Sequence, residues 1–156
     1  MTKNPIVTSI KRGTLPEDGP IKASHGQAEK QECRILIVDD LRFNREYSAS
    51  ILQEAGFVVD NAEDGAVGLD LATRNCYDLI LMDIQMPNMD GLESTRRIRS
   101  FPHCSKVPIL AVTANTMDED RKRCFEAGMN DFLPKPYLPS QLLGLVRKWL
   151  RQNSAP

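Results

Sequence analysis

Apolar residues in this chain gather in short, uninterrupted runs, separated by longer stretches in which they recur at helical spacing. Short runs without polar alternation are typical of strands that are buried on both faces of a parallel sheet. Strand and helix patterns alternate five times, which predicts a doubly wound α/β fold with helices on both faces of a five-stranded parallel sheet. The predicted strands cover residues 34–38, 57–60, 78–82, 107–112 and 131–133.

Local signals place several ends of the predicted helices. Gly56 is a stop signal for the first helix, and the turn at 64–65 leads into the second. Thr116 and Glu119 stand three residues apart, which predicts a capping box at the start of the fourth helix. Pro139 is a good first residue for the fifth. One face of the first helix is predicted to comprise Asn44, Tyr47, Ser48, Ile51, Leu52 and Ala55.

The first 32 residues differ in composition from the rest of the chain. They contain three prolines and three glycines, with mixed charge and little periodicity. A segment of this kind cannot bury enough apolar surface to offset the entropy of ordering. We therefore expect a disordered tail or linker over residues 1–32 and one domain over residues 33–153. A linker favours a piece of a longer protein, and a native disordered tail is the alternative.

Composition and charge narrow the class of protein. Hydrophobic residues make up 41% of the chain and charged residues 26%, as in soluble globular domains. The formal net charge of -1 gives no electrostatic reason to expect nucleic acid as a partner. The apolar runs are far shorter than the roughly 18 residues of a membrane span, and the four scattered cysteines suit reduced thiols. We expect a cytoplasmic segment without membrane contact, with or without a membrane-anchored parent protein.

Polar residues with distinct chemistry follow four of the predicted strands. Asp39 and Asp40 follow the first strand, Asp83 the third, Thr113 the fourth and Lys135 the fifth. Because the carboxyl ends of parallel strands meet at one edge of the sheet, we expect these side chains at one site. Two unpaired carboxylates about 5 Å apart repel by roughly 3 kcal/mol at an effective dielectric constant near 20, so three acids require a cation. Oxygen ligands of this kind favour Mg2+.

This set of side chains predicts phosphoryl transfer to Asp83. A carboxylate can act as a nucleophile and form an aspartyl phosphate. The reaction otherwise needs mostly positioning and charge neutralisation, which Lys135 and the hydroxyl of Thr113 suit. Taken alone, each residue has a simpler alternative: the 39–40 pair as a helix cap, Thr113 as a turn hydroxyl, and Lys135 as a solvated loop charge. The strand ends together, in this order, are far more specific.

Four motifs carry a resemblance to a known family. They are Ile-Leu-Ile-Val-Asp-Asp at 35–40, Leu-Met-Asp-Ile-Gln-Met-Pro-Asn-Met-Asp-Gly at 81–91, Val-Thr-Ala at 112–114 and Leu-Pro-Lys-Pro at 133–136. Over about residues 33–151 the chain resembles the receiver (response regulator) domains of two-component phosphorelays, which implies a flavodoxin-like (βα)5 receiver fold. The resemblance implies that Asp83 accepts a phosphoryl group from phosphohistidine. It also implies a Mg2+ site formed by Asp39, Asp40, Asp83 and the backbone carbonyl of Gln85.

The same resemblance implies a conformational switch. Thr113 is the switch hydroxyl, Lys135 is the phosphate-binding lysine, and Phe132, three residues before Lys135, matches the aromatic switch position. Phosphorylation is expected to draw Thr113 inward and Phe132 into the vacated space. Leu41 and Phe43 fall near the active-site end of the first helix, where we expect partner docking. The alternative is that Phe43 packs partly inward.

The sequences of residues 82–91 and 111–115 look most like those of receivers attached to hybrid sensor histidine kinases. No DNA-binding output domain follows residue 151. We therefore expect a C-terminal receiver whose partners are a sensor histidine kinase, a histidine phosphotransfer domain or both. A free-standing single-domain response regulator is the alternative. A magnesium-dependent aspartate phosphatase fits less well, because Gln85 stands where that class has a second acid. A receiver would catalyse only its own phosphorylation and dephosphorylation.

Overall fold

The computed structural model describes residues 31–154, in which strands and helices alternate as the sequence predicts. The predicted tail lies outside the described residues, except for residues 31 and 32. The strands are β1 (Arg34–Val38), β2 (Val58–Ala62), β3 (Leu79–Asp83), β4 (Ile109–Thr113) and β5 (Asp131–Pro134). The helices are α1 (Arg42–Glu54), α2 (Gly65–Arg74), α3 (Gly91–Arg99), α4 (Asp118–Ala127) and α5 (Pro139–Asn153), with a short 3-10 helix, η1 (Pro102–Cys104), before β4.

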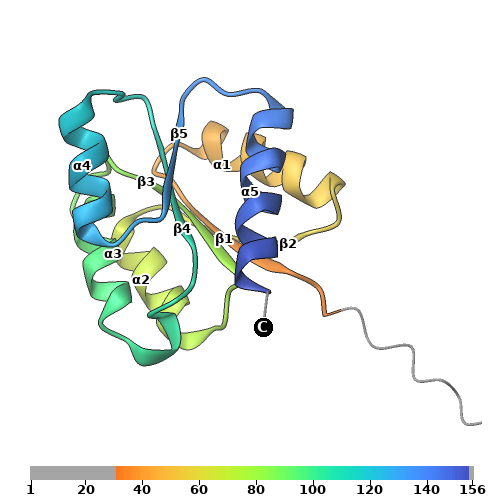
Figure 1. Cartoon of the computed structure of the whole chain (residues 1–156), viewed down its shortest axis with the longest axis horizontal. Helices are drawn as coiled ribbons and strands as arrows, with labels where there is room; N and C mark the ends of the chain where they lie inside the picture. The colour runs from red at the N-terminus through yellow and green to blue at the C-terminus, as the bar shows by residue number, and fades with distance from the viewer. Residues whose placement is uncertain (1–30, 155–156) are drawn as a thin grey trace, which may run out of the picture. The chain divides into compact units, whose positions relative to one another are not determined.

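The strands form one parallel sheet in the order β2-β1-β3-β4-β5 (Figure 1), which confirms the predicted doubly wound fold. From β1 the chain adds β2 on one side and then β3 on the other, so the direction of winding reverses between β1 and β3. In open α/β sheets, ligands bind at such a reversal, beyond the carboxyl ends of the strands. Asp39 and Asp40 directly follow β1, and Asp83 ends β3, so all three acids lie at this point.

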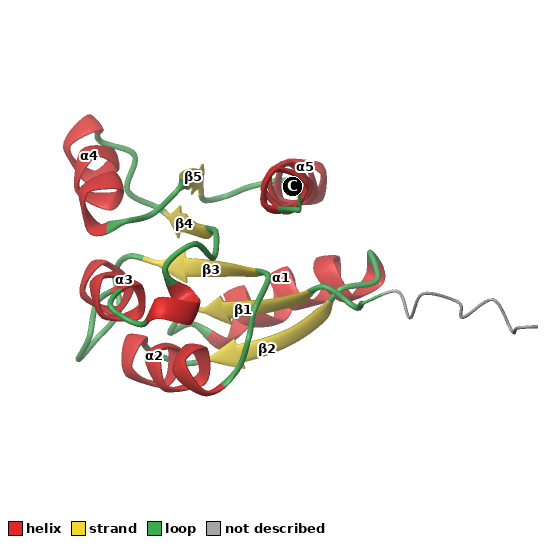
Figure 2. Cartoon of the chain, turned by 60° about the horizontal axis from the view of Figure 1, so that its bottom comes forward, coloured by secondary structure: helices red, strands yellow, loops and turns green. Residues whose placement is uncertain are grey.

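Two layers of helices cover the sheet (Figure 2). One apolar cluster joins the sheet to α2, α3 and α4, and a second joins the opposite face to α1 and α5. Strand β1 contributes alternately to the two: Leu36 and Val38 belong to the first cluster, Ile35 and Ile37 to the second. All five residues of β3 are buried, as predicted for a strand covered on both faces. The packing on both sides fixes the carboxyl ends of β1 and β3 relative to each other.

Helix α1 buries half of its predicted face. Ser48, Ile51 and Leu52 are buried, whereas Asn44 and Ala55 are half-buried. Tyr47 differs from the prediction, because it is 38% exposed and its ring faces Tyr137, with the ring centroids 5.7 Å apart. Phe43 is 77% exposed, so the alternative in which this ring packs inward is wrong.

The start of α4 differs from the predicted capping box. The N-cap residue is Met117, one position after Thr116, and it makes no side-chain cap hydrogen bond. Because the first helical residue is Asp118, Glu119 is the second, and the spacing that a capping box requires is lost. The first turn instead holds Asp118, Glu119 and Asp120, whose negative charges suit the positive end of the helix dipole.

Two other elements differ in detail from the sequence pattern. Strand β4 begins at Ile109, two residues later than predicted. Pro108 has no N–H to donate, although its carbonyl accepts a hydrogen bond of 2.8 Å from the backbone N–H of Ile80. Helix α2 continues through Gly68. Glycine fits this position because an added Cβ would lie 2.8 Å from Cγ2 of Val38 on β1.

Candidate active site

Three carboxylates converge at the reversal between β1 and β3. One oxygen from each of Asp39, Asp40 and Asp83 lies within 4.8 Å of the other two. Asp39 and Asp83 are buried, and Asp40 is half-buried. Val38 and Met82 are paired in the parallel register of β1 and β3, so the residues that follow them leave the sheet side by side. The structure therefore brings together the three acids that the sequence predicts at one site.

Lys135 places a positive charge among these acids. Its Nζ lies 2.6 Å from Oδ2 of Asp39 and 3.7 Å from Oδ2 of Asp83. The residue follows β5, and its backbone N–H donates to the carbonyl of Thr113 at 2.8 Å, which ties it to the end of β4. Lys135 is thus not the solvated loop charge of the simpler alternative, because its side chain is only 18% exposed.

Asp39 also organises the loop between β1 and α1. Its Oδ1 accepts hydrogen bonds from the backbone N–H of Leu41 at 2.9 Å and from Nδ2 of Asn44 at 3.2 Å. Its Oδ2 accepts from Lys135. The hydrogen bonds to the loop and the ion pair with Lys135 are therefore compatible, because they use different oxygens of the same carboxylate.

The electrostatics of Asp83 favour a bound cation. Burial raises the pKa of Asp83 to about 6, with a further rise from the charge of Asp39 and a smaller one from Asp40. Lys135 and the backbone N–H of Gln85 lower this pKa without cancelling the effect of burial. Ionising all three acids therefore costs free energy unless another positive charge is present. A divalent cation meets this requirement.

The donor set fits Mg2+. The cluster offers only carboxylate oxygens, which hard cations prefer. Two oxygens bound to one Mg2+ at about 2.1 Å are at most about 4.2 Å apart, so the spacing within the cluster needs little adjustment to surround such an ion. Gln85, two residues after Asp83, is exposed. The role of its carbonyl as a ligand stays a prediction.

The two predicted switch residues are both buried. Thr113, at the end of β4, is 1% exposed, and its Oγ1 accepts a hydrogen bond of 3.1 Å from the backbone N–H of Asn115. Phe132, on β5, is 9% exposed, and the guanidinium of Arg121 lies 5.5 Å from the centroid of its ring. The hydroxyl proton of Thr113 is thus available to an acceptor at the site. The Phe132 ring belongs to the apolar cluster that joins the sheet to α2, α3 and α4.

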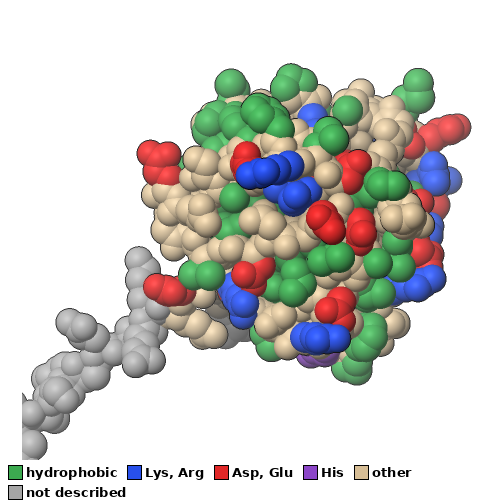
Figure 3. All heavy atoms as spheres, turned by 180° about the vertical axis from the view of Figure 1, so that it is seen from behind, with side chains coloured by type: hydrophobic (Ala, Val, Ile, Leu, Met, Phe, Trp, Pro, Cys, Tyr) green, Lys and Arg blue, Asp and Glu red, His purple; other side chains and the backbone are tan. Residues whose placement is uncertain are grey.

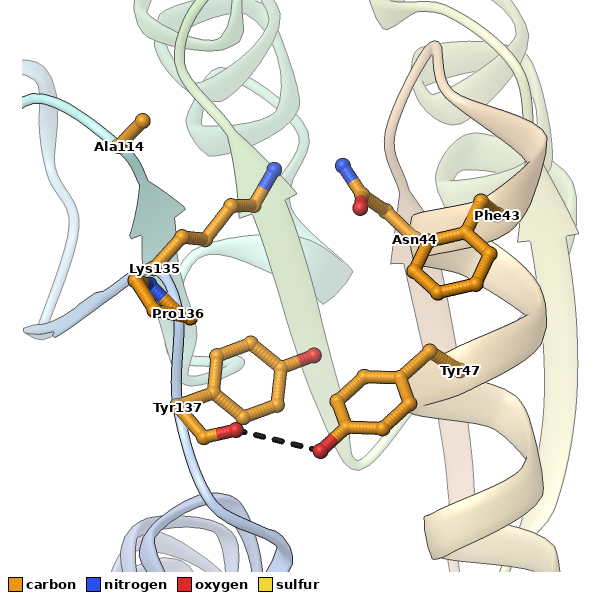
Figure 4. Close-up of a pocket in the computed structure, with 7 residues that line it drawn as sticks. All are labelled: Phe43, Asn44, Tyr47, Ala114, Lys135, Pro136 and Tyr137. Atoms are coloured by element: carbon orange, nitrogen blue, oxygen red, sulfur yellow. Dashed lines mark hydrogen bonds between the residues drawn. The ribbon is translucent and has the colours of Figure 1, made fainter.

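A cavity of about 440 Å³ opens beside Lys135, between α1 and the loop that follows β5 (Figure 4). In this view Lys135 and Asn44 point toward the same end of the cavity. The Tyr47 hydroxyl donates to the carbonyl of Tyr137 at 3.2 Å. The hydroxyls of Ser48 and Tyr137 form a buried hydrogen bond. The lining residues are Phe43, Asn44, Tyr47, Ala114, Lys135, Pro136 and Tyr137.

Sequence reasoning missed the aromatic wall of this cavity. Phe43 and Tyr47 are stacked with ring centroids 6.4 Å apart, as expected for residues one helical turn apart. That spacing is visible in the sequence and was the available signal. Leu41 is 58% exposed, just before α1, and does not line the cavity. Tyr137 could not be placed, because its contacts depend on how α1 packs against the loop after β5.

On the face opposite to that of Figure 1, acidic and basic side chains are interspersed with apolar ones (Figure 3). This face therefore shows no large patch of one charge, in agreement with the net charge of -1. Among residues 31–154, no helix is both long enough and apolar enough to cross a membrane.

The strand order and the helices on both faces of the sheet are those of a flavodoxin-like α/β domain. Residues 35–147 match the family described as the response regulator receiver domain. The chain therefore belongs to the receiver domain family of two-component signal transduction.

The relatives include both kinases and response regulators. The chain is 41% identical over 125 residues to Histidine protein kinase 1 of Candida albicans, a match that covers 74% of this chain and 5% of the kinase. It is 38% identical over 122 residues to the transcriptional regulatory protein HprR of Escherichia coli, covering 78% of this chain and 53% of that protein. The chain thus spans a small part of the kinase and about half of the regulator.

A solved structure shows the same fold. It is the receiver domain of the sensor histidine kinase PA1611 from Pseudomonas aeruginosa, with a magnesium ion coordinated in its active-site cleft. The match has a TM-score of 0.73 and 38% identity, and it covers 77% of this chain and 98% of that chain.

Proposed function

We propose that Asp83 accepts a phosphoryl group from phosphohistidine with the help of Mg2+, and that the domain relays this group to a histidine phosphotransfer domain. The observation that carries the proposal is the convergence of the three carboxylates within 4.8 Å, with the Lys135 ammonium 2.6 Å from one of them. A bare cluster of this kind would be destabilising. The cluster is suited to bind Mg2+ and a phosphoryl group together.

The reaction is a displacement at phosphorus. An oxygen of the Asp83 carboxylate attacks in line, a new O–P bond forms, and the P–N bond to the histidine breaks. The imidazole leaves with the electron pair and takes a proton from solvent. Lys135 neutralises a phosphoryl oxygen, moving away from Asp39 to do so. Mg2+, held by Asp39, Asp40, Asp83 and the carbonyl of Gln85, would supply further positive charge to the phosphoryl oxygens.

Thr113 and Phe132 carry the proposed readout. The Thr113 hydroxyl accepts from Asn115 and retains its own proton, with which it can donate to a phosphoryl oxygen. Movement of Thr113 toward the phosphoryl group favours the buried position of Phe132. The ring packs under Arg121 of α4, so its position biases the surface formed by α4 and β5.

We further propose that the partner docks over the cavity beside Lys135. Phe43 is among the most exposed apolar side chains of the described residues, and it stacks on Tyr47 at the rim. Leu41, which lies between the acidic loop and α1, is also exposed. A helix that carries the donor histidine would cover these rings while its imidazole reached Asp83. Large exposed aromatic residues next to a pocket are typical anchors of a protein interface.

The parent protein proposed here is a hybrid sensor histidine kinase. The Candida kinase and the receiver of PA1611 support this origin by their similarity. The similarity to HprR supports a response regulator instead, which is the second candidate. Gln85 stands at the position where an aspartate phosphatase would need its acid, so turnover of phosphate esters is not part of the proposal.

The test is phosphorylation of the full chain with radiolabelled acetyl phosphate and with a phosphorylated histidine phosphotransfer domain. The wild-type chain should incorporate label only when Mg2+ is present, and Asp83→Asn should abolish incorporation. Asp118→Asn is the matched control, because Asp118 is exposed at the start of α4, outside the acidic cluster. Label that persists on the Asp83→Asn variant at the wild-type level would refute the assignment of the phosphoacceptor.

A further inference from the structure

One arginine of α1 holds the backbone of both acidic residues that follow β1. Nη1 of Arg45 donates to the carbonyl oxygen of Asp39 at 2.7 Å and to that of Asp40 at 3.1 Å. The backbone N–H of the same residue donates to the carbonyl of Leu41 at 3.2 Å, in the first turn of α1. Arg45 therefore joins the helix to three successive peptide groups of the acidic loop.

Asp40 depends on this contact more than Asp39 does. The carboxylate of Asp39 accepts hydrogen bonds from three donors, in Leu41, Asn44 and Lys135. Within residues 31–154, the carboxylate of Asp40 accepts none, and the carbonyl held by Arg45 is the polar group through which Asp40 is fixed. Arg45 is half-buried, so its guanidinium is partly withdrawn from water and its hydrogen bonds are not freely exchanged with solvent.

We infer that Arg45 is a positioning residue for the cation site. By holding two successive carbonyls it orients the peptide groups of the acidic loop, and so sets the directions in which the carboxylates of Asp39 and Asp40 project. The inference rests on the proposed Mg2+ site. Groups that orient metal ligands through hydrogen bonds typically change metal affinity by about 10- to 100-fold when they are removed. Bonds from a charged donor are also stronger than those between neutral groups.

The sign of the effect separates positioning from simple electrostatics. A positive charge beside a cation site repels the cation, so removal of the charge alone tightens metal binding. Loss of positioning weakens metal binding. Arg45→Met removes the charge and the donors while keeping most of the side-chain length, so the direction of the change shows which effect is larger.

The experiment measures Mn2+ binding to the full chain by electron paramagnetic resonance of the free ion, followed by competition with Mg2+. Arg45→Met should weaken Mn2+ binding about tenfold. Arg45→Lys should weaken it less, because an ammonium keeps the charge but lacks the guanidinium geometry. Arg42→Met is the matched control: Arg42 lies on the same helix with its side chain 82% exposed and paired with Glu46 at 2.6 Å. This control should leave binding unchanged or slightly tighter.

The outcomes distinguish the inference from the function on which it rests. Equal or tighter binding by Arg45→Met, beside normal binding by the wild type, overturns the inference and leaves the proposed function standing. A wild-type chain that binds neither Mn2+ nor Mg2+ overturns both. Circular dichroism checks that each variant is folded. If Arg45→Met does not fold, Arg45→Lys decides, and an unchanged dissociation constant in that variant overturns the positioning role.

Discussion

The ammonium group of Lys135 lies 2.6 Å from Oδ2 of Asp39, so the lysine pairs with a proposed metal ligand. This ion pair is largely buried, with the two side chains 18% and 6% exposed. Metal binding and the Lys135 contact therefore use the same carboxylate, that of Asp39. The lysine serves the acidic cluster as a counter-ion before phosphorylation, and a phosphoryl group would give it a new partner.

Lys135→Met should thus have opposite effects on two measurements. Removal of a positive charge from the cluster should tighten Mn2+ binding severalfold, because the repulsion of the cation is lost. The same change should slow labelling by acetyl phosphate at least tenfold, because a phosphoryl oxygen loses its counter-charge. Lys122→Met, which removes a lysine 77% exposed on α4, is the control and should change neither. Parallel losses of both binding and labelling would contradict the roles proposed for Lys135.

The pKa of Asp83 predicts how stability depends on pH in the metal-free protein. Burial raises this pKa to about 6, above its ordinary value of 3.8. Because the folded state binds the proton more tightly than the unfolded state, the contribution of Asp83 to stability is fully present below about pH 4 and is lost as the pH rises through about 6. Asp83→Asn should therefore be more stable than the wild type at pH 7, by roughly 1–3 kcal/mol.

Urea unfolding in EDTA between pH 4 and pH 8 measures this difference. The advantage of the Asp83→Asn variant should shrink toward pH 4, where the buried carboxyl of the folded wild type is protonated and its ionisation no longer costs stability. Saturating Mg2+ should reduce the advantage at pH 7, because the cation stabilises the wild-type cluster. A difference in the free energy of unfolding that stays constant over this pH range would show that ionisation of Asp83 is not its cause.

Docking over the cavity predicts a partner-specific effect of Phe43. Phe43→Ala removes the most exposed ring of the rim, so phosphotransfer from a phosphorylated histidine phosphotransfer domain should slow at least fivefold. Labelling by acetyl phosphate should stay at the wild-type rate, because a small donor does not need the docking surface. Phe125→Ala is the matched control, since Phe125 is a ring 48% exposed on α4. Equal rates of phosphotransfer for the wild type and Phe43→Ala would exclude docking on this ring.

The strands and the converging acids were predictable from the sequence because their signals are local. The apolar runs set β1, β3 and β4 as buried strands, whereas β2 is partly exposed. In a parallel sheet the residues that follow the strands lie at the same edge. The start of α4 was not predictable, because Met117, whose side chain makes no cap hydrogen bond, takes the N-cap position in place of Thr116. The contacts of Arg45 and of Tyr137 depend on how α1 packs, which no local pattern records.

Arg99 is another residue whose role only the folded chain shows. Burial lowers the pKa of its guanidinium, yet the group is well satisfied by hydrogen bonds between 2.6 and 2.9 Å. These bonds join the end of α3 to the segments that precede β4 and β5. The acceptors are the carbonyls of Gly128, Cys104 and Val107 and the side chain of Asn130.

Arg99→Met should therefore lower the free energy of unfolding by about 2–4 kcal/mol, because it leaves several partly buried carbonyls without a donor. Arg97→Met is the matched control two residues earlier. The Arg97 side chain is 55% exposed and pairs with Glu93 at 2.7 Å, so its loss should cost less than about 1 kcal/mol. Chemical denaturation of both variants checks the difference. A similar small effect for both would mean that water replaces Arg99 at these carbonyls.

Gly91, at the start of α3, lies against the backbone of the reactive acid, Asp83. A Cβ at this position would collide with the carbonyl oxygen of Asp83, and the Gly91 N–H donates to the carbonyl of Ile84 at 2.8 Å. Gly91→Ala must therefore push the start of α3 away from the end of β3. The expected cost is about 1–3 kcal/mol of stability, together with slower labelling of Asp83 by acetyl phosphate.

The control for this change is Gly144→Ala in the middle of α5. A Cβ at Gly144 has no neighbour within 4 Å, so the substitution meets no obstacle. Alanine is a better helix former than glycine, and the variant should gain about 0.5–1 kcal/mol of stability with an unchanged labelling rate. Opposite signs for the same chemical change would show that contact with the Asp83 backbone, rather than glycine flexibility, explains the requirement at Gly91. If Gly91→Ala were as stable and as readily labelled as the wild type, the end of β3 would have room that the structure does not show.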